Sequence, residues 1–337
     1  MKKRVLITGG AGFIGVNVAH RFLRRGWRVS VLDDLSRKGT DRNILWLMRQ
    51  GVVEFTKADL RNPALAERWV RSRTDGLEAV VHLAAQVAVT TSVEDPRTDF
   101  EKNALASLNI LEAVRRSGKK PFTFYASTNK VYGGMEHVRT ALRAGRWSYV
   151  GLPQGVSERE PIDFHSPYGC SKGAADQYFR DYHRIYGIPT VVFRQSCIYG
   201  PHQQGNEDQG WIAHFMKMSR AGKGVSVFGD GRQVRDALFV EDLVDAMEAA
   251  YARRKKAAGR IYNVGGGPRS TLSLRELLAW IAKRSGRALP VAWWPWRPGD
   301  QKVYVSDVRL AARELGWRPT TSLNAGLERL WTALGGA

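Results

Sequence analysis

Short apolar runs and longer amphipathic stretches alternate along most of the first 264 residues. The apolar runs are four or five residues long and rich in branched residues, which is typical of buried parallel strands. We expect strands at 5–8, 28–32, 53–56, 79–83, 122–126, 190–193 and 261–264. Helical periodicity marks the stretches 13–25, 64–72, 100–117, 167–186 and 241–252. This alternation predicts an α/β fold built on a doubly wound parallel sheet.

A glycine-rich turn joins the first predicted strand to the first predicted helix. It reads Gly9-Gly-Ala-Gly12-Phe-Ile-Gly15, with three glycines spaced three apart. Glycine lets the backbone turn tightly and approach a pyrophosphate, which then lies on the helix N-terminus. The second predicted strand ends in Asp33-Asp34, where a carboxylate can bind adenosine ribose hydroxyls. These features predict a nicotinamide dinucleotide site, and they favour NAD because Asp33 repels a 2′-phosphate.

Tyr168 and Lys172 are four residues apart in a predicted helix and therefore lie on one face of it. An ammonium near a phenol favours the phenolate, so we expect Tyr168 to titrate well below its usual pKa of about 10. Such a phenolate is a base for an alcohol proton at neutral pH. A dinucleotide beside it would take the hydride, so the two motifs together predict redox chemistry at an alcohol.

The composition changes near residue 195, where Gly, Pro, Gln and Trp become more frequent and the helices become shorter. We expect residues 1–194 to form the dinucleotide-binding domain, with 235–264 returning to its sheet as a helix and a strand. Residues 195–234 and 265–337 would form a smaller C-terminal substrate-binding lobe. The irregular stretch 133–165 separates Thr128 from Tyr168 and is predicted to form a loop over the site.

Charge and cysteine content narrow the function classes. The chain has 337 residues and a formal net charge of +20, from 52 Lys and Arg against 32 Asp and Glu. The arginines are scattered and no nucleic-acid reading element is present, so we expect no nucleic-acid partner; the positive field would attract an anionic substrate. The two cysteines, Cys170 and Cys197, provide no disulfide framework, which favours the cytoplasm. No apolar run is long enough for a membrane span, and no metal site is predicted.

The chain resembles the extended short-chain dehydrogenases/reductases that modify nucleotide sugars, over nearly its whole length. Within that superfamily, 127–133 and 163–178 resemble the CDP-paratose 2-epimerases, also called CDP-tyvelose epimerases. The superfamily markers are Gly9-x-x-Gly12-x-x-Gly15, Asp59-Leu60, His82-Leu-Ala-Ala85, Asn103, Tyr168-x-x-x-Lys172, 229–236 and Arg297-Pro-Gly-Asp300.

The resemblance implies a Rossmann domain and a role for each matching residue. It implies that Thr128, Tyr168 and Lys172 are catalytic, with Tyr168 as base and acid. The residues that it assigns to NAD are Gly9, Gly12, Phe13, Ile14, Gly15, Asp33, Asp34, Asp59, Leu60, Leu83, Ala84, Ala85, Asn103, Tyr168 and Lys172. Those that it assigns to the substrate are Gln86, Thr128, Asn129, His165, Cys197, Arg235 and Arg297. Arg235 and Arg297 would hold the diphosphate, which suits a bidentate guanidinium.

One departure from the superfamily changes the expected reaction. Sugar 4,6-dehydratases have Thr-Asp-Glu where this chain has Thr128-Asn129-Lys130, and those carboxylates transfer the protons for water loss. Dehydration is therefore not expected. Epimerisation by proton abstraction would need a second acid/base group, for which His165 and Cys197 are the candidates. Cys197 also stands where related 4-epimerases have Asn.

The resemblance thus implies an isomerase: an NAD-dependent nucleotide-sugar 2-epimerase, with a CDP-hexose as the favoured substrate and NAD tightly bound and recycled. Two alternatives stay open. One is an epimerase that acts on a GDP- or UDP-hexose or at carbon 4, and the other is an NAD-bound regulatory protein without catalysis. Relatives form a dimer through the helices at 100–117 and 167–186, so a homodimer is expected. The apolar residues on these stretches are Leu105, Leu108, Ile110, Leu111, Ala174, Tyr178 and Tyr182.

Overall fold

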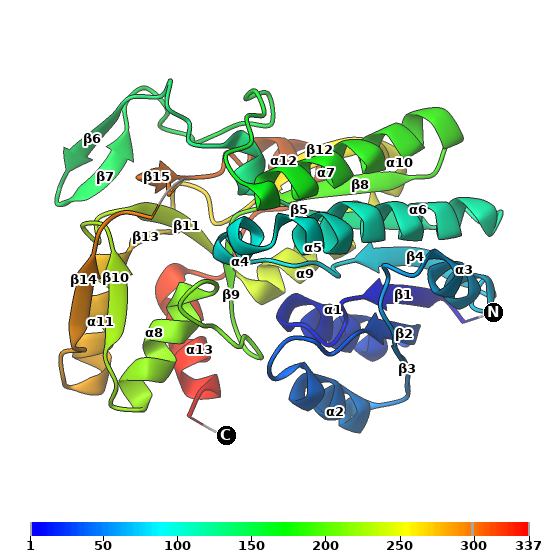
Figure 1. The fold of residues 1–337 in the computed structure, drawn as a ribbon, viewed down its shortest axis with the longest axis horizontal. Coiled ribbons are helices and arrows are strands. Elements are labelled where there is room, and N and C mark those ends of the chain that lie inside the picture. Colours follow the sequence, from blue (N-terminus) through cyan, green and yellow to red (C-terminus); the bar gives the residue numbers. More distant parts are fainter. Residues whose placement is uncertain (1, 298–299, 336–337) are drawn as a thin grey trace.

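Seven parallel strands form the central sheet of the protein, in the order β12-β8-β5-β4-β1-β2-β3 (Figure 1). The structure is a computed structural model that describes residues 2–297 and 300–335. The strands are β1 (Arg4–Thr8), β2 (Arg28–Asp33), β3 (Val53–Lys57), β4 (Leu77–His82), β5 (Phe122–Thr128), β8 (Thr190–Gln195) and β12 (Arg260–Val264). Each predicted strand is confirmed, as is the doubly wound α/β fold, because the order reverses beside β1 and all the pairings are parallel.

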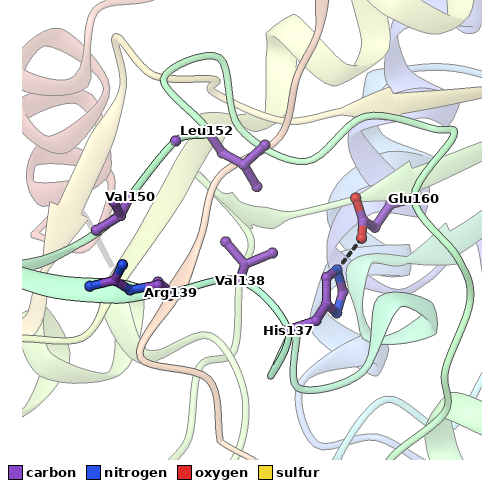
Figure 2. Close-up of a pocket in the computed structure, with 7 residues that line it drawn as sticks. His137, Val138, Arg139, Val150, Leu152 and Glu160 are labelled. Atoms are coloured by element: carbon purple, nitrogen blue, oxygen red, sulfur yellow. Dashed lines mark hydrogen bonds and ion pairs between the residues drawn. The ribbon is translucent and has the colours of Figure 1, made fainter.

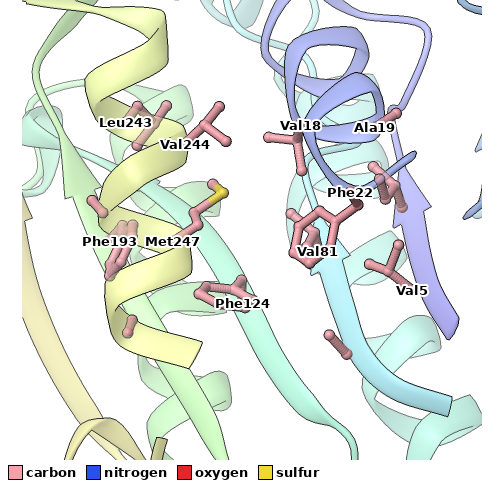
Figure 3. Close-up of a cluster of buried hydrophobic side chains, with 14 of the residues drawn as sticks. Val5, Val18, Ala19, Phe22, Val81, Phe124, Phe193, Leu243, Val244 and Met247 are labelled. Carbon is pink, nitrogen blue, oxygen red and sulfur yellow. The ribbon is translucent and has the colours of Figure 1, made fainter. Parts of the chain in front are cut away.

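Helices cover both faces of this sheet because successive strand residues point to opposite sides. In β1, Val5 and Ile7 pack into one core, and Leu6 packs into the other. The first core is covered by α1 (Phe13–Arg24), α2 (Thr40–Gln50), α9 (Val240–Ala252), α10 (Arg254–Ala257) and α12 (Arg309–Leu315). The second is covered by α3 (Pro63–Arg71), α6 (Ala106–Arg116) and α7 (Pro167–Tyr186). Figure 3 shows Met247 of α9 facing the sheet residues Phe124 and Phe193.

The predicted helices are all present, with two differences. The stretch 100–117 divides into the end of α5 (Pro96–Phe100), a π-helical turn η1 (Glu101–Leu105) and α6. Helix α2 was not predicted, because its apolar pattern is weak: Ile44 and Leu47 are buried in the core and Trp46 packs against it, but Leu45 and Met48 are exposed. A further short helix, α4 (Val89–Glu94), precedes α5.

The C-terminal lobe has its own core, built from strands and helices that follow residue 195. Its strands are β9 (Cys197–Tyr199), β10 (Val225–Phe228), β11 (Val234–Phe239), β13 (Thr271–Ser273), β14 (Val291–Trp294) and β15 (Val303–Tyr304). Its helices are α8 (Trp211–Arg220), α11 (Leu274–Ser285) and α13 (Leu323–Ala333). Helices α8, α11 and α13 enclose a core that includes Phe215, Ile281 and Trp331.

The chain crosses between the two cores in places that differ from the expected boundaries. Within 235–264, α9 and β12 pack with the large sheet, whereas β11 pairs with β9, β13 and β15 in the lobe. Within 265–337, α12 packs against the large sheet through Ala311 and Leu315. Both differences have the same cause. Each helix or strand packs against the core that covers its apolar side chains, whether or not its neighbours in the sequence pack there.

The segment 133–165 is more ordered than predicted. It contains the antiparallel hairpin β6 (Thr140–Arg143) and β7 (Arg146–Tyr149), which is tied to the lobe. The Trp147 indole donates to Asp230 at 2.8 Å, and the Tyr149 hydroxyl donates to the Val303 carbonyl at 2.8 Å. A shallow hollow of about 390 Å³ lies at the base of the hairpin, where His137 and Glu160 form an ion pair (Figure 2). None of the predicted site residues lines this hollow.

Candidate active site

The glycine turn brings backbone atoms too close together for any side chain. A Cβ on Gly15 would lie 2.3 Å from the Gly9 carbonyl oxygen, and one on Gly9 would lie 2.6 Å from the Ala84 nitrogen. A Cβ on Gly12 would meet only the Gly9 oxygen, at 3.1 Å. Gly12 is the N-cap of α1 and no side chain caps this helix end. The glycines therefore leave room in front of a helix N-terminus whose N–H groups suit a pyrophosphate.

Asp33 is held at the end of β2 by the same turn. Its carboxylate accepts hydrogen bonds from the Ala11 N–H at 3.0 Å and the Leu35 N–H at 2.9 Å. Burial raises the pKa of Asp33, and these backbone N–H groups oppose the rise. Asp34 next to it accepts from the Ser36 N–H and lies 3.8 Å from the Lys102 ammonium. A carboxylate fixed beside the phosphate cradle fits an adenosine ribose.

The side chains of the neighbours Asp59 and Leu60 have different surroundings in the structure. The Leu60 side chain is buried in the sheet core, so only its backbone is available to a ligand. Asp59 follows β3 and forms an ion pair of 2.7 Å with Arg61, which lowers the pKa of Asp59 against the opposing effect of burial. Arg61 also reaches Glu101. This charged group lies on the same edge of the sheet as Asp34, consistent with a position near the adenine.

The residues after β4 meet the π-helical turn. The Leu83 N–H donates to the Thr8 carbonyl at 3.0 Å, which places Leu83, Ala84 and Ala85 beside the end of β1. The Gln86 N–H donates to the Asn103 side-chain oxygen at 2.8 Å. Asn103 is 1% exposed and is directed inward by η1. Such π-turns occur frequently at functional sites.

Thr128 and Tyr168 come together across the carboxyl edge of the sheet. Thr128 ends β5, and Tyr168 stands in the first turn of α7, which Ser166 caps at 3.0 Å through the Gly169 N–H. The Tyr168 backbone N–H donates to the Ser92 hydroxyl at 3.1 Å. The Thr128 side chain is near enough to Tyr168 to lower the pKa of its phenol. This pair is suited to contact one hydroxyl of a substrate.

The expected acidity of Tyr168 is wrong for the protein as the structure describes it. Burial raises the pKa of Tyr168 to about 12, and the nearby Thr128 side chain only partly opposes the rise. The helical spacing correctly places Lys172 one turn away, but it does not reveal that the phenol is buried. Tyr168 is therefore a neutral phenol at neutral pH.

Lys172 is itself buried, with 4% of its surface exposed, and its ammonium lies 4.4 Å from the centre of the Tyr125 ring. Burial lowers the pKa of Lys172 to about 7, while the charges of Asp99 and Asp176 raise it.

His82, the last residue of β4, is a core residue that bonds Thr8 and Ser107 on its two ring nitrogens. Burial and the charge of Lys172 lower the pKa of His82 to about 3, so it is neutral.

The predicted diphosphate ligands, Arg235 and Arg297, lie in the lobe. Arg235 forms an ion pair of 2.6 Å with Asp300, and Arg297 lies 3.3 Å from Asp208 with its guanidinium 3.8 Å from the Phe228 ring centre. Pro298 and Gly299 of the predicted motif lie outside the described residues.

Lys130 stands where sugar 4,6-dehydratases have a glutamate. Burial and the nearby charge of Arg235 lower the pKa of Lys130 to about 8, and Asp300 opposes this.

The two candidates for a second acid/base group have different surroundings. The ring nitrogens of His165 face carboxylates, with Asp163 at 2.9 Å and Glu136 at 3.9 Å. Burial raises the pKa of the Cys197 thiol to about 12, partly opposed by a hydrogen bond with Trp211. A thiol that is neutral at pH 7 is a poor proton acceptor. Asn129 lies next to Thr128 in the 3-10 turn η2 (Asn129–Tyr132) and bonds it at 3.4 Å.

The site also contains a buried carboxylate, Asp99, that the sequence pattern does not indicate. Asp99 of α5 is 1% exposed and bonds Gln86, Asn103 and Ser171. A polar residue in a short helix gives no sign of such burial in the sequence. The only available signal was its spacing of four residues from Asn103, which places both on one helix face.

These residues fit NAD. The open cradle before α1 suits the pyrophosphate, Asp33 suits the adenosine ribose, and Lys172 lies beside Tyr168 at the end where a nicotinamide would react. The structure brings the predicted dinucleotide residues and the predicted catalytic residues to one edge of one sheet.

Comparisons with known proteins agree with this arrangement. The family model of GDP-mannose 4,6 dehydratase matches residues 6–330. The chain is 40% identical to a CDP-paratose 2-epimerase of Salmonella typhi, over 98% of this chain and 99% of that protein. It is 31% identical to a dTDP-glucose 4,6-dehydratase of Xanthomonas campestris pv. campestris, over 96% of this chain and 90% of that protein.

A solved structure extends the comparison to the fold. The UDP-glucose 4-epimerase of Thermus thermophilus, in complex with NAD, superposes with a TM-score of 0.83 at 33% identity and covers 99% of both chains. The match of the family model over nearly the whole chain confirms the resemblance inferred from the motifs. The chain belongs to the GDP-mannose 4,6-dehydratase family of the extended short-chain dehydrogenases/reductases.

Proposed function

We propose that this protein is an NAD-dependent nucleotide-sugar 2-epimerase of the CDP-paratose type. The observation that carries the proposal is the placement of Thr128, at the end of β5, near Tyr168 of α7, with an amide and an ammonium following Thr128 where dehydratases have carboxylates. The pair provides for proton transfer at one hydroxyl. The 40% identity to a CDP-paratose 2-epimerase supports carbon 2 and a CDP-hexose.

Different residues of this chain would bind NAD and the substrate. Gly9, Gly12 and Gly15 would hold the pyrophosphate of NAD, Asp33 its adenosine ribose and Lys172 its nicotinamide ribose. Arg235 and Arg297 would hold the substrate diphosphate from the lobe. Bound NAD would supply an acceptor for the hydrogen on carbon 2 and return it to the opposite face of that carbon, so it would be recycled and remain bound.

As a phenolate, Tyr168 would accept the proton of the carbon-2 hydroxyl and become a phenol, with Thr128 bonding the same oxygen. A keto group at carbon 2 has no configuration, so rotation of the sugar while the diphosphate stays bound presents the other face. Tyr168 then returns the proton to the oxygen. The lobe and the sheet domain hold opposite ends of the substrate, which allows the sugar to turn without release.

Two other proton-transfer reactions are disfavoured by specific groups. Water loss needs carboxylates after Thr128, and Asn129 and Lys130 cannot replace them as acid and base at that position. Inversion by direct proton abstraction needs a second base. The raised pKa of the Cys197 thiol argues against that candidate, and the fate of a deuterium at carbon 2 tests whether His165 acts as one.

A homodimer and a cytoplasmic location are part of the proposal. Phe100, Tyr178 and Ile185 expose 56%, 47% and 65% of their surfaces on α5 and α7, a patch that a partner subunit would cover. Ile110 and Leu111, which were expected on this face, lie in the sheet core. Cys170 and Cys197 are free thiols, which suits a reducing compartment. No described helix has the length and apolarity that a membrane crossing needs.

The test is to incubate the protein with CDP-, UDP- and GDP-hexoses deuterated at carbon 2, in ordinary water, and to identify the products by NMR. We expect inversion at carbon 2 of a CDP-hexose with the deuterium retained, because the hydrogen is transferred within one site. Inversion at carbon 4, or turnover of a UDP- or GDP-hexose alone, would contradict the proposed specificity. Loss of the deuterium to water would contradict the redox route and indicate a second base.

A further inference from the structure

Asp99 is a buried carboxylate at the junction of three elements of the site. One oxygen accepts hydrogen bonds from the Gln86 amide at 3.1 Å and the Asn103 amide at 3.0 Å. The other accepts from the Ser171 hydroxyl. Burial raises the pKa of Asp99, and the Ser171 hydrogen bond and the charge of Lys172 oppose the rise. A buried carboxylate is costly unless its lone pairs are used in this way.

Each of these donors belongs to the proposed site or adjoins it. Gln86 follows the strand that ends at His82, Asn103 stands in the π-turn, and Ser171 immediately precedes Lys172 on α7. Asn103 also bonds the Gln86 N–H at 2.8 Å and the Ser171 hydroxyl at 3.1 Å. Loss of the Asp99 carboxylate would therefore loosen the contact between the cofactor edge of the sheet and the catalytic helix.

Asp99 also acts on Lys172 through space. The charged groups that affect Lys172 are Asp99 on α5 and Asp176 on α7, which both favour the ammonium. His82 faces it from β4 as a neutral ring, and Tyr125 faces it from β5 through its ring. Burial opposes both acids and leaves the pKa of Lys172 at about 7, so a small change in nearby charge alters its ionisation at neutral pH.

The two acids differ in what else they neutralise. Asp176 forms an ion pair with Arg194 through both oxygens, at 2.9 and 3.1 Å, and accepts from Ser127 at 2.8 Å. Its charge is therefore balanced by a guanidinium that is equally buried. The described side chains that bond Asp99 are all neutral. Asp99 consequently provides the uncompensated negative charge that faces Lys172.

We propose that Asp99 is a positioning residue that keeps the side chain of Lys172 as an ammonium and fixes Asn103 and Gln86 beside it. This rests on the proposed function only for its consequence in catalysis. A charged Lys172 would favour proton transfer at Tyr168, and Asp99 favours this charge together with Asp176.

The experiment measures Lys172 directly in the NAD-loaded protein, by NMR of ¹³Cε-labelled lysine as a function of pH. The signal is assigned with Lys172→Met. In Asp99→Asn the amide replaces the carboxylate at nearly the same size and removes the charge. Removing a charge that raises the pKa of Lys172 must lower that pKa. We expect the ammonium fraction at pH 7 to fall from about half to about a tenth or less.

Asp95→Asn is the matched control. Asp95 is four residues away and caps α5 by accepting from the Thr98 N–H at 3.0 Å, a role that asparagine also performs. It removes the same charge from the surface, so the Lys172 titration should not move. An unchanged Lys172 titration in Asp99→Asn would overturn the proposal, even if that variant were less stable.

The reciprocal measurement keeps the test decisive if Asp99→Asn does not fold. In Lys172→Met the carboxylate loses its facing ammonium, so the pKa of Asp99, followed by ¹³Cγ-aspartate NMR, should rise above its wild-type value. No rise would refute the coupling. Both titrations are independent of the sugar, so a wrong substrate assignment would leave them intact. If the proposed function holds, the alkaline limb of kcat/KM also shifts to lower pH in Asp99→Asn and not in Asp95→Asn.

Discussion

Replacement of Tyr168 by Phe removes one hydroxyl from the centre of the proposed site and leaves the ring in place. That hydroxyl is buried, and the nearby Thr128 side chain lowers its pKa, so at most about one hydrogen bond is lost with it. A single net hydrogen bond contributes about 0.5–1.5 kcal/mol to stability, so the variant should fold and keep its NAD. Any large loss of turnover would then report chemistry and not unfolding.

The magnitude follows from the two perturbed groups. With pKa values of about 12 for Tyr168 and about 7 for Lys172, only about one molecule in 100,000 has the phenolate and the ammonium together between these pH values. A preformed phenolate is therefore rare, and Tyr168 must lose its own proton before it can accept the proton of the substrate hydroxyl. Proton transfer by a positioned group contributes about 10²–10⁴-fold, which is about 2.7–5.4 kcal/mol of barrier.

The assay compares single-site variants under saturating CDP-hexose, with product measured by NMR and NAD measured after denaturation. Tyr168→Phe should retain about 0.01–1% of wild-type turnover with full NAD content. Tyr251→Phe is the matched control, because it also removes one hydroxyl, which bonds Glu78 at 2.9 Å on another part of the sheet domain. Turnover of Tyr168→Phe close to that of Tyr251→Phe would refute the assignment of the proton to Tyr168.

Three further predictions concern the cofactor, the assembly and the fold. Denatured protein should release NAD and not NADP, because the Asp33 carboxylate would repel a 2′-phosphate; mostly NADP in the extract would contradict this. Light scattering at micromolar concentration should give a dimer mass, and Tyr178→Glu with Ile185→Glu should give a monomer; a monomeric wild type would exclude the proposed interface. Asp176→Asn should lower the free energy of unfolding by about 3–5 kcal/mol in urea titrations, because it leaves the buried Arg194 charge unbalanced; a change below about 1 kcal/mol would show that the pair is not coupled to stability.

The sheet could be predicted from the sequence because its strands are buried on both faces. Val5, Leu6 and Ile7 are fully buried, so the run is apolar without interruption and cannot be mistaken for a surface strand. The glycine turn could also be predicted from the sequence, because close backbone contact excludes every other residue at Gly15. The position of Tyr168 relative to Lys172 follows from helical geometry alone.

The failures concern properties that depend on distant parts of the chain. Burial of Tyr168 changes the sign of its pKa shift, and burial is decided by elements far away in sequence. The π-turn around Asn103 inserts an extra residue into a helix, and no residue type marks it. Asp99 resembles any surface acid until the fold places Ser171 beside it. Local pattern determines the elements, whereas solvation of a side chain is determined by the assembled fold.

Because the chain crosses between the two cores, residues 1–194 do not contain every element of the large sheet domain. A fragment that ends at residue 194 would contain the phosphate cradle and the catalytic helix but would lack α9 and β12. Phe124 and Phe193, which Met247 covers in the intact protein, would then face water. The cofactor half therefore depends on segments synthesised after much of the lobe, and a ribosome must release most of the chain before the NAD site can be completed. Premature termination would leave an aggregation-prone sheet and not a partial enzyme.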